Sequence, residues 1–268
     1  LRKSLESVGI TSYNTVVDVT NYVMMTLGQP MHAFDYNKIR GSSIVVDTLP
    51  KLESNIKALD DKDYEVPAGT LMIQDRERNI AIAGVIGQTN SCITPESNCI
   101  VLESANFKAS SVRHTSLKLG LRTESSARFE KRLDPVQASQ ALALAIDLIK
   151  KLHPDAVVAS EMIDVDNAAP QTPTIELGHE DLHRLLGKQL DIKEAVSILR
   201  RLSFEVSDKK DILTVQVPSY RGQDVTLPVD VLEEVARIHG FHNIEPALPR
   251  IRMASPISNV ASHVERKL

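Results

Sequence analysis

Residues 80–87 read I-A-I-A-G-V-I-G, and this apolar stretch decides how the first part of the chain is expected to fold. The uncharged run from Ile80 to Ile86 predicts a continuous strand buried in a core. Gly87 follows it directly and predicts a turn of the chain at that point. Outward from this stretch, short β-prone runs at 44–46, 71–74 and 100–102 are bounded by turn-forming residues and predict further strands.

The first clear helix is predicted from about Pro135 to Leu152. Asp134 is a favourable N-cap, Pro135 suits the first helical position, and Pro154 ends the pattern. The apolar residues that recur on one face at helical spacing are Ala138, Ala141, Leu142, Ala145, Ile146, Ile149 and Leu152. Such an amphipathic helix is expected to cover the strands of the same domain.

A second unit is predicted after a polar, proline-flanked stretch at 164–173. A strand at 174–177 precedes a short helix at 179–186, which Gly187 stops, and a second helix that Asp191 caps and that runs to Leu202. A hairpin of 204–206 and 212–217 follows, and a helix at 228–239 stops at Gly240.

These patterns predict an α+β fold class. A mixed α/β domain is expected over 1–165 and a small winged-helix-like α+β domain over 166–246, with 247–268 as a linker toward a neighbouring part of the protein.

Composition excludes several classes of protein. The 268 residues are 42% hydrophobic and 25% charged, as in ordinary globular chains, and no apolar run approaches the length of a membrane span. The net charge of −4 does not indicate nucleic-acid binding by the chain as a whole. Cys92 and Cys99 are too few for a four-cysteine zinc site and are read as reduced thiols of a cytoplasmic protein. Because Leu1 is not a methionine, the chain is interpreted as a piece of a longer protein.

Two groups of residues could hold a metal. The stretch 179–183 reads H-E-D-L-H, which matches the zinc-protease string, but His179 follows a glycine at the helix start and no third ligand is evident, so a solvated face is favoured over zinc. Asp230, Glu233 and Glu234 fall at i, i+3 and i+4 of one predicted helix, and Asp224 lies just upstream. Such carboxylates suit Mg²⁺, with a solvated acidic face as the alternative.

The stretch 108–132 is locally basic, with seven Lys or Arg against two Glu. Its basic residues are Lys108, Arg113, Lys118, Arg122, Arg128, Lys131 and Arg132. This cluster could bind a phosphate backbone, with an ordinary basic surface as the alternative.

Several segments together resemble one family. N-T-V-V-D-V-T-N-Y-V from Asn14, G-Q-P-M-H-A-F-D from Gly28, the stretch 80–87, V-L-E-S-A from Val101 and R-T-E-S-S-A-R-F-E-K from Arg122 resemble the editing domain of the bacterial phenylalanyl-tRNA synthetase β subunit. V-P-S-Y-R-G-Q-D-V from Val217 and the helix from Asp230 resemble its next domain. The resemblance covers about 1–250 in the family's order and implies an internal fragment of that subunit.

The resemblance implies a proofreading site that hydrolyses mischarged Tyr-tRNA(Phe). It makes Glu103 the acceptor that reads the tyrosine hydroxyl and places His32 beside the ester or terminal ribose, with Thr123 as a third catalytic residue. The implied substrate-binding residues are Thr20, Asn21, Pro30, Gly84, Gly87 and Ser125. No Ser or Cys has an evident activating base, so attack by a positioned water, assisted by the tRNA's terminal hydroxyl, is favoured over a covalent intermediate.

Three positions depart from the family's usual residues. Ser125 stands where alanine is frequent, and Gln88 replaces the second glycine of a usual pair. Arg132 replaces a frequent glycine, which predicts that a positive φ is not required there.

At the level of the whole enzyme, the resemblance implies an (αβ)₂ synthetase that joins Phe to tRNA(Phe) with ATP at an active site on the α subunit. It also implies that Asp224, Asp230, Glu233 and Glu234 bind Mg²⁺ shared with that subunit. The fragment alone is not expected to aminoacylate. The alternatives are a non-catalytic scaffold for the α subunit and tRNA, or a zinc hydrolase at His179 and His183.

Overall fold

The computed structural model describes residues 1–166, 172–186, 190–244 and 264–267. The chain divides into two compact units, one of Leu1–Pro173 with Val217–Asp224 and one of Thr174–Gln216 with Val225–Leu268. Gly187 and nearly all of the predicted linker 247–268 lie outside the described residues. Among the described residues, no helix is both long and apolar enough to cross a membrane.

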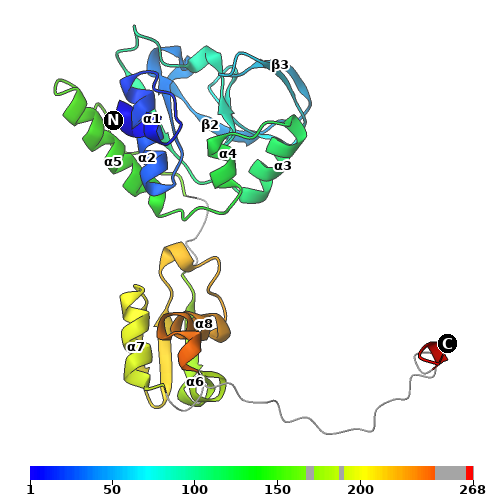
Figure 1. The fold of residues 1–268 in the computed structure, drawn as a ribbon. Coiled ribbons are helices and arrows are strands. Elements are labelled where there is room, and N and C mark those ends of the chain that lie inside the picture. Colours follow the sequence, from blue (N-terminus) through cyan, green and yellow to red (C-terminus); the bar gives the residue numbers. More distant parts are fainter. Residues whose placement is uncertain (167–171, 187–189, 245–263, 268) are drawn as a thin grey trace. The chain divides into compact units, whose positions relative to one another are not determined.

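The first unit is built from short antiparallel strands (Figure 1). A four-stranded sheet has the order β2 (Val45–Thr48), β5 (Leu71–Gln74), β6 (Asn79–Ile82) and β7 (Ile86–Gly87). Two further pairs are β1 (Met31–Asp35) with β8 (Ile100–Ser104) and β3 (Glu53–Lys57) with β4 (Asp63–Val66). The predicted strands at 44–46, 71–74 and 100–102 thus coincide with β2, β5 and β8.

The stretch 80–87 is a tight hairpin rather than one strand. Strands β6 and β7 pair with each other, with Ala81 opposite Gly87 and Ile82 opposite Ile86. The turn between them lies at 83–85, where Gly84 has a φ of 68°, a conformation that L residues rarely adopt. The prediction of a continuous strand that turns at Gly87 was therefore wrong. The run is apolar throughout because the turn between the two strands is buried in the core as well.

Five helices flank these strands. They are α1 (Arg2–Ser7), α2 (Thr15–Leu27), α3 (Ala109–Leu119), α4 (Glu124–Phe129) and α5 (Gln137–Leu152). Helix α2 precedes the first helix that the sequence predicted, and it begins where the Asn14 side chain accepts a hydrogen bond from the Val17 N–H. Its Val19 and Val23 pack with alanines of α5 in a small core of their own, and Figure 1 shows the two helices side by side.

The turn after α4 corrects a second prediction. Arg132 has a φ of 59°, so the chain does adopt the left-handed conformation at this position. The replacement of a frequent glycine by Arg132 therefore does not mean that the backbone is relaxed there. Phe129 before the turn is buried and Leu133 after it packs against the same core cluster, so the chain must reverse between them.

The second unit is a small α+β domain. Strands β9 (Thr174–Gly178), β10 (Glu205–Lys209) and β11 (Ile212–Gln216) form an antiparallel sheet in the order β10-β11-β9. It carries α6 (His179–Leu186), α7 (Ile192–Arg201) and α8 (Pro228–His239), so the helix–helix–hairpin–helix order and the α+β fold class are confirmed. The Asp191 cap is also confirmed, since its carboxylate accepts a hydrogen bond from the Lys193 N–H.

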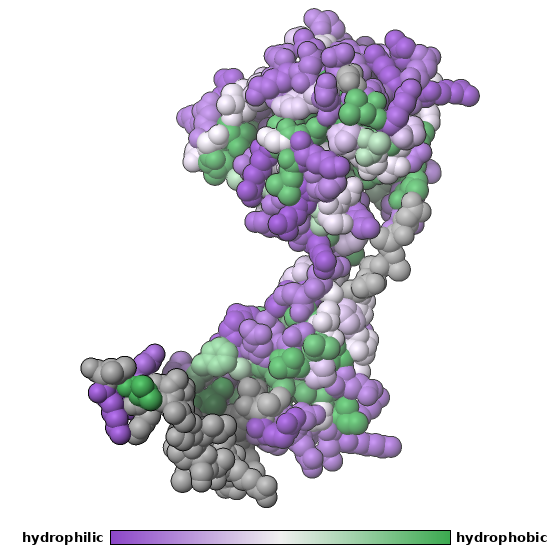
Figure 2. Space-filling view, turned by 90° about the vertical axis from the view of Figure 1, so that its right-hand side faces the viewer, coloured by the Kyte–Doolittle hydropathy of each residue, from purple (hydrophilic) through white to green (hydrophobic). Residues whose placement is uncertain are grey.

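Hydrophilic side chains cover most of the face of each unit that is drawn in Figure 2, with hydrophobic residues in separate patches. The apolar side chains of the first unit gather instead in a buried cluster between the sheet and α3–α4, which includes Phe34, Met72, Ile80, Ile82 and Phe129. The candidate site lies beside this cluster, on the β1–β8 pair.

Candidate active site

His32 and Glu103 face each other on neighbouring strands. Strand β1 carries His32 and strand β8 carries Glu103, and the two residues are direct partners in the antiparallel register. Cross-strand partners project their side chains from the same face of the sheet. The structure therefore brings together two predicted residues that are 71 positions apart in the chain, at 32 and 103.

Each of these side chains buries a polar atom that has no protein partner. His32 Nε2 and Glu103 Oε2 are inaccessible and make no hydrogen bond within the described part of the chain. Burial lowers the pKa of His32 to about 4 and raises the pKa of Glu103 to about 7. At neutral pH the imidazole is therefore uncharged, and the carboxyl group exchanges readily between its acid and its ionised form.

Gly87 provides the room that the His32 ring occupies. A Cβ at Gly87 would lie 2.7 Å from both Cε1 and Nε2 of His32, and 3.0 Å from Cδ1 of Leu59. The Leu59 N–H donates to the Gly87 carbonyl at 3.1 Å, which fixes this leucine beside the ring. The His32 ring also packs edge-on against Phe34, with 4.6 Å between the ring centroids. Leu59 was not identified from the sequence, where no local motif marks it.

Gly84 is packed closely against side chains of the core. A Cβ there would lie 2.9 Å from Cγ2 of Val112, 3.0 Å from Cδ2 of Phe107 and 3.2 Å from Cδ2 of Phe129. All three are buried core residues. Close packing and the positive φ explain why a glycine stands here, and its role as a substrate-binding residue stays a prediction.

Helix α4 is attached to the segment that carries both glycines. Thr123 Oγ1 donates to the Val85 carbonyl at 2.7 Å and accepts from the Ser126 N–H at 3.0 Å, so this hydroxyl caps α4 and ties it to the β6–β7 turn. Ser125 Oγ donates to the Gly84 carbonyl at 3.3 Å. The hydroxyl of Thr123 is thus already engaged, which gives the residue a positioning role here.

The remaining predicted substrate-binding residues lie before and at the start of β1. Thr20 is buried on α2, where its hydroxyl donates to the Val17 carbonyl at 2.8 Å, and Asn21 is half-buried next to it. Pro30 is buried just before β1. Its neighbour Gln29, which the sequence analysis did not single out, donates to the Ala105 carbonyl at 2.7 Å and so links the start of β1 to the end of β8.

Gln88 does not contact the site. Since side chains alternate along an extended chain and Gly87 faces His32, the Gln88 side chain points to the opposite face. There it is buried and accepts a hydrogen bond from Asn90 Nδ2 at 3.2 Å. This departure from the family's usual glycine therefore changes a polar network behind the site.

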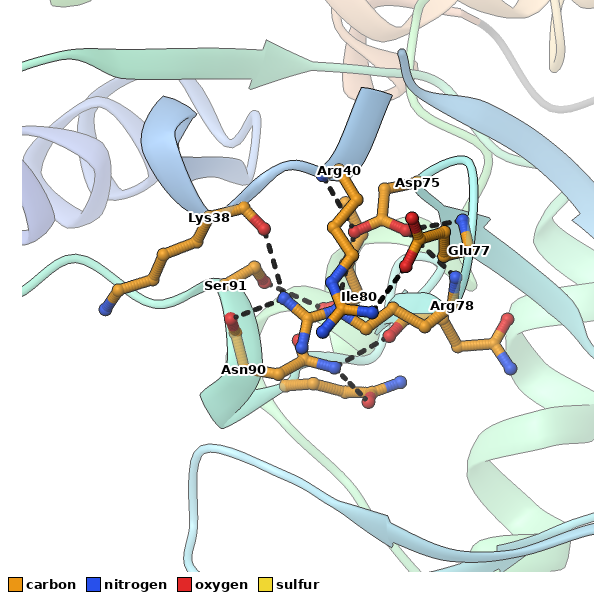
Figure 3. Close-up of polar contacts among 10 residues, drawn as sticks. Lys38, Arg40, Asp75, Glu77, Arg78, Ile80, Asn90 and Ser91 are labelled. Carbon is orange, nitrogen blue, oxygen red and sulfur yellow. Dashed lines mark hydrogen bonds and ion pairs between the residues drawn. The ribbon is translucent and has the colours of Figure 1, made fainter. Parts of the chain in front are cut away.

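A half-buried arginine, Arg78, connects the segments that follow β1 and β7 (Figure 3). Arg78 Nη2 donates to the carbonyl of Lys38 at 3.1 Å and to that of Asn90 at 3.2 Å, and its Nε lies 3.4 Å from Asp75 Oδ2. Asp75 also accepts hydrogen bonds from the N–H groups of Arg40, Glu77 and Arg78. This network holds the strand of His32 and the strand of Gly87 in fixed relation.

Of the predicted metal ligands, Asp224 belongs to the first unit and Asp230, Glu233 and Glu234 belong to the second. No group of three or more His, Cys, Asp or Glu residues in the described part of the chain is placed to bind an ion. Asp224 pairs with Arg221, Asp230 accepts the N–H groups of Thr226 and Leu227 at the start of α8, and buried Glu234 pairs with Arg237. Glu233 is exposed. The assignment of these four carboxylates to Mg²⁺ stays a prediction.

The H-E-D-L-H stretch is not assembled for zinc either. His179 Nε2 lies 3.0 Å from Asp208 Oδ1 and its Nδ1 lies 3.6 Å from Asp211 Oδ1, so the ring pairs with the β10–β11 hairpin. His183 lies one turn further along α6, and its Nδ1 is buried without a partner in the described residues. The zinc-protease geometry, with both histidines on one ion, is absent from the described residues.

Two family models match the chain in the order of its two units. The B3/4 domain model matches residues 1–154, and the tRNA synthetase B5 domain model matches residues 175–241. Since the first match covers more than half of the residues, the chain belongs to the B3/4 domain family.

The curated relatives are β subunits of one enzyme. The chain is 38% identical over its full length to the phenylalanine--tRNA ligase beta subunit of Leptospira biflexa, and covers 34% of that protein. It is 37% identical, over 93% of its length, to the same subunit of Bacillus subtilis, of which it covers 31%. The chain thus spans about a third of the relatives that it matches. The resemblance to phenylalanyl-tRNA synthetase β subunits is confirmed.

A solved structure shows a weaker likeness. It is an N-terminal fragment of the phenylalanyl-tRNA synthetase β subunit from Pyrococcus horikoshii, with 12% identity and a TM-score of 0.45. The match covers 84% of this chain and 65% of that one.

Proposed function

We propose that the first unit hydrolyses mischarged Tyr-tRNA(Phe), and that Glu103 selects the substrate. The observation that supports this most directly is the buried Glu103 Oε2, which has no hydrogen-bond partner in the described residues. A tyrosine hydroxyl would supply the missing donor, and a phenylalanine ring would leave the oxygen unpaired. An unpaired buried acceptor costs about 1–3 kcal/mol, which corresponds to a preference of roughly 5–150-fold for Tyr over Phe.

His32 has the properties of a group that orients the reacting end of the substrate. Its Nε2 has no partner in the described residues and is uncharged at neutral pH, so it can accept a hydrogen bond from a water or from a ribose hydroxyl. Gly87, Leu59 and Phe34 fix the ring. In this proposal the oxygen of a water attacks the ester carbonyl carbon, the bond between that carbon and the ribose oxygen breaks, and the ribose oxygen takes a proton from the water to become a hydroxyl.

The need for such a site follows from the limits of the synthetic reaction. A pocket shaped for Phe rejects Tyr poorly, because a hydrophobic pocket discriminates against one added hydroxyl by only about 10². A second site that requires the hydroxyl corrects the error. We therefore assign editing to this chain, and we assign the joining of Phe to tRNA(Phe) with ATP and Mg²⁺ to an assembled (αβ)₂ enzyme of which this chain would be one part.

The test is deacylation of pre-formed Tyr-tRNA(Phe) and Phe-tRNA(Phe) by the intact αβ enzyme. His32→Ala should slow the hydrolysis of Tyr-tRNA(Phe) at least tenfold, and Glu103→Ala should remove the preference for Tyr over Phe. Asp147→Asn is a matched control, because Asp147 makes an exposed ion pair with Lys151 on α5, away from both strands. If both site variants hydrolyse Tyr-tRNA(Phe) like the wild type, the unit is instead a scaffold or tRNA-interaction module.

A further inference from the structure

Arg132 holds a backbone conformation that is costly for its residue type. Its φ of 59° lies in the left-handed region, which residues with a Cβ adopt only at a steric cost. The conformation is needed by the fold, because the chain must turn between buried Phe129 and partly buried Leu133. The Arg132 N–H bonds to the Phe129 carbonyl at 3.4 Å, and Asn106 Nδ2 donates to the Leu133 carbonyl at 2.8 Å. The turn therefore requires this φ, which glycine would adopt freely, and does not require an arginine.

The side chain of Arg132 makes no contact among the described residues that would offset this cost. It is exposed and makes no hydrogen bond or ion pair with any residue that the structure describes. Two other arginines of the same segment differ, since Arg122 pairs with Glu130 at 3.4 Å and Arg128 pairs with Glu124 at 2.6 Å. Backbone strain that no stabilising contact of the side chain offsets is typical of residues that act on a ligand.

The position of Arg132 connects it to the candidate site. The segment 123–133 is attached to the site at both ends, by Thr123 to the Val85 carbonyl and by Leu133 to Asn106. Asn106 lies three residues after Glu103, so the turn at Arg132 is fixed beside the end of β8. Lys131 is the neighbouring residue, and it is also exposed and without a partner among the described residues.

Helix α3, which packs on α4, adds further positive charge. Its Arg113 and Lys118 and the preceding Lys108 are all exposed, and none is paired within the described residues. Uncompensated cations on α3 and on the segment next to it are suited to a polyanion. The guanidinium group is the side chain that binds a phosphate through two parallel hydrogen bonds, which a lysine cannot do.

We propose that Arg132 binds a backbone phosphate near the acceptor end of the aminoacyl-tRNA whose ester enters the His32–Glu103 site. Lys131 and the cations of α3 extend this contact along the RNA. The inference rests on the proposed editing function, since it names the part of the protein that holds the substrate. In this proposal the arginine makes the turn less stable and increases the affinity of the protein for tRNA.

Arg132→Gly in the intact αβ enzyme tests this directly, because it removes the guanidinium and relaxes the backbone together. The melting temperature should rise by about 1–4 °C, as expected when left-handed strain is relieved and partly offset by the flexibility of glycine in the unfolded chain. The affinity for uncharged tRNA(Phe) should fall about threefold to tenfold in 0.1 M salt. The slope of log K against log salt should decrease in magnitude by roughly 0.7–0.9, the value for one phosphate contact. Arg132→Lys should lose less affinity for tRNA(Phe) than Arg132→Gly does.

Two controls separate the proposals. Lys210→Gly relaxes another exposed basic residue at positive φ, 51°, in the β10–β11 turn, and should leave the affinity for tRNA unchanged. His32→Ala should slow deacylation at least tenfold without changing the salt slope, so a failure of the editing proposal is visible independently. Wild-type affinity and salt slope for Arg132→Gly would overturn the inference. A higher melting temperature together with weaker, less salt-dependent binding supports it.

Discussion

Replacing Gly87 by alanine should impair the proposed editing reaction while leaving the fold nearly unchanged. Gly87 is not among the residues of positive φ, so alanine can adopt its backbone conformation. The new methyl group would lie 2.7 Å from Cε1 and Nε2 of His32. Carbon atoms pack at about 3.5 Å or more, so the imidazole must move by roughly 0.8 Å.

The size of the effect follows from this displacement. A shift of about 1 Å at a reacting group costs up to about 10² in rate. We expect kcat/KM for Tyr-tRNA(Phe) deacylation to fall about 10–100-fold, and stability to fall by only about 1 kcal/mol, the low end for added volume beside a movable ring. Deacylation assays and thermal melts of the intact enzyme measure the two quantities separately.

A double-mutant cycle shows whether the effect passes through His32. In the His32→Ala background the ring that would clash is gone, so adding Gly87→Ala should have little further effect on rate. An equal loss in both backgrounds, or a wild-type rate for Gly87→Ala, would refute the idea that Gly87 acts by placing the imidazole.

Three further predictions concern the same site. His32 is protonated more readily in the unfolded chain, so the contribution of His32 to stability is lost as the pH falls from 6.5 toward about 4. Glu103 is ionised more readily in the unfolded chain, so the contribution of Glu103 to stability is lost as the pH rises from 4.5 toward about 7. Glu103→Gln should therefore lose stability as the pH is lowered, and His32→Ala should lose stability as the pH is raised. Each loss should be at most about 3 kcal/mol in the free energy of unfolding measured by urea titration. Stability profiles of the two variants that run parallel with pH would contradict this. Gly84→Ala should destabilise by about 2–4 kcal/mol, measured by urea unfolding, since both its φ and the core oppose a methyl group; a loss below 1 kcal/mol would count against this packing. Thr123→Ala should lower the melting temperature through about 1–2 kcal/mol of lost capping, and Thr123→Ser should restore it together with deacylation; failure of serine to rescue would show that the methyl group matters instead.

Local signals located the second unit well. The helix Pro228–His239 has a proline at its start and a glycine after its end, and the structure gives it those bounds. Asp191 caps α7 as its side chain and position indicate. Such features depend on a few neighbouring residues and can therefore be predicted from the sequence.

The first unit was harder because its elements depend on distant contacts. Helix α2 is rich in β-branched residues, which disfavour helix, and is stabilised by packing on α5 more than 100 residues later. The hairpin within 80–87 looks like one strand because its turn is buried as well. Arg132 shows a related limit: its φ is set by the burial of residues on both sides, so its own side chain gives no sign of it.

His32 and Glu103 were found by resemblance, and their chemistry came from the structure. A histidine and a glutamate 71 residues apart carry no signal that they share a register. Only the fold shows that both are desolvated and that Leu59 and Gln29 support them.

The pairing of β1 with β8 also bears on the order in which the candidate site assembles. Closing a loop of 71 residues between His32 and Glu103 costs more chain entropy than forming the local β5–β6–β7 meander. The meander should therefore fold first, and the β1–β8 pair should close around it. During synthesis we therefore expect the candidate site to assemble only after the chain beyond Thr123 has left the ribosome, in one late step of folding.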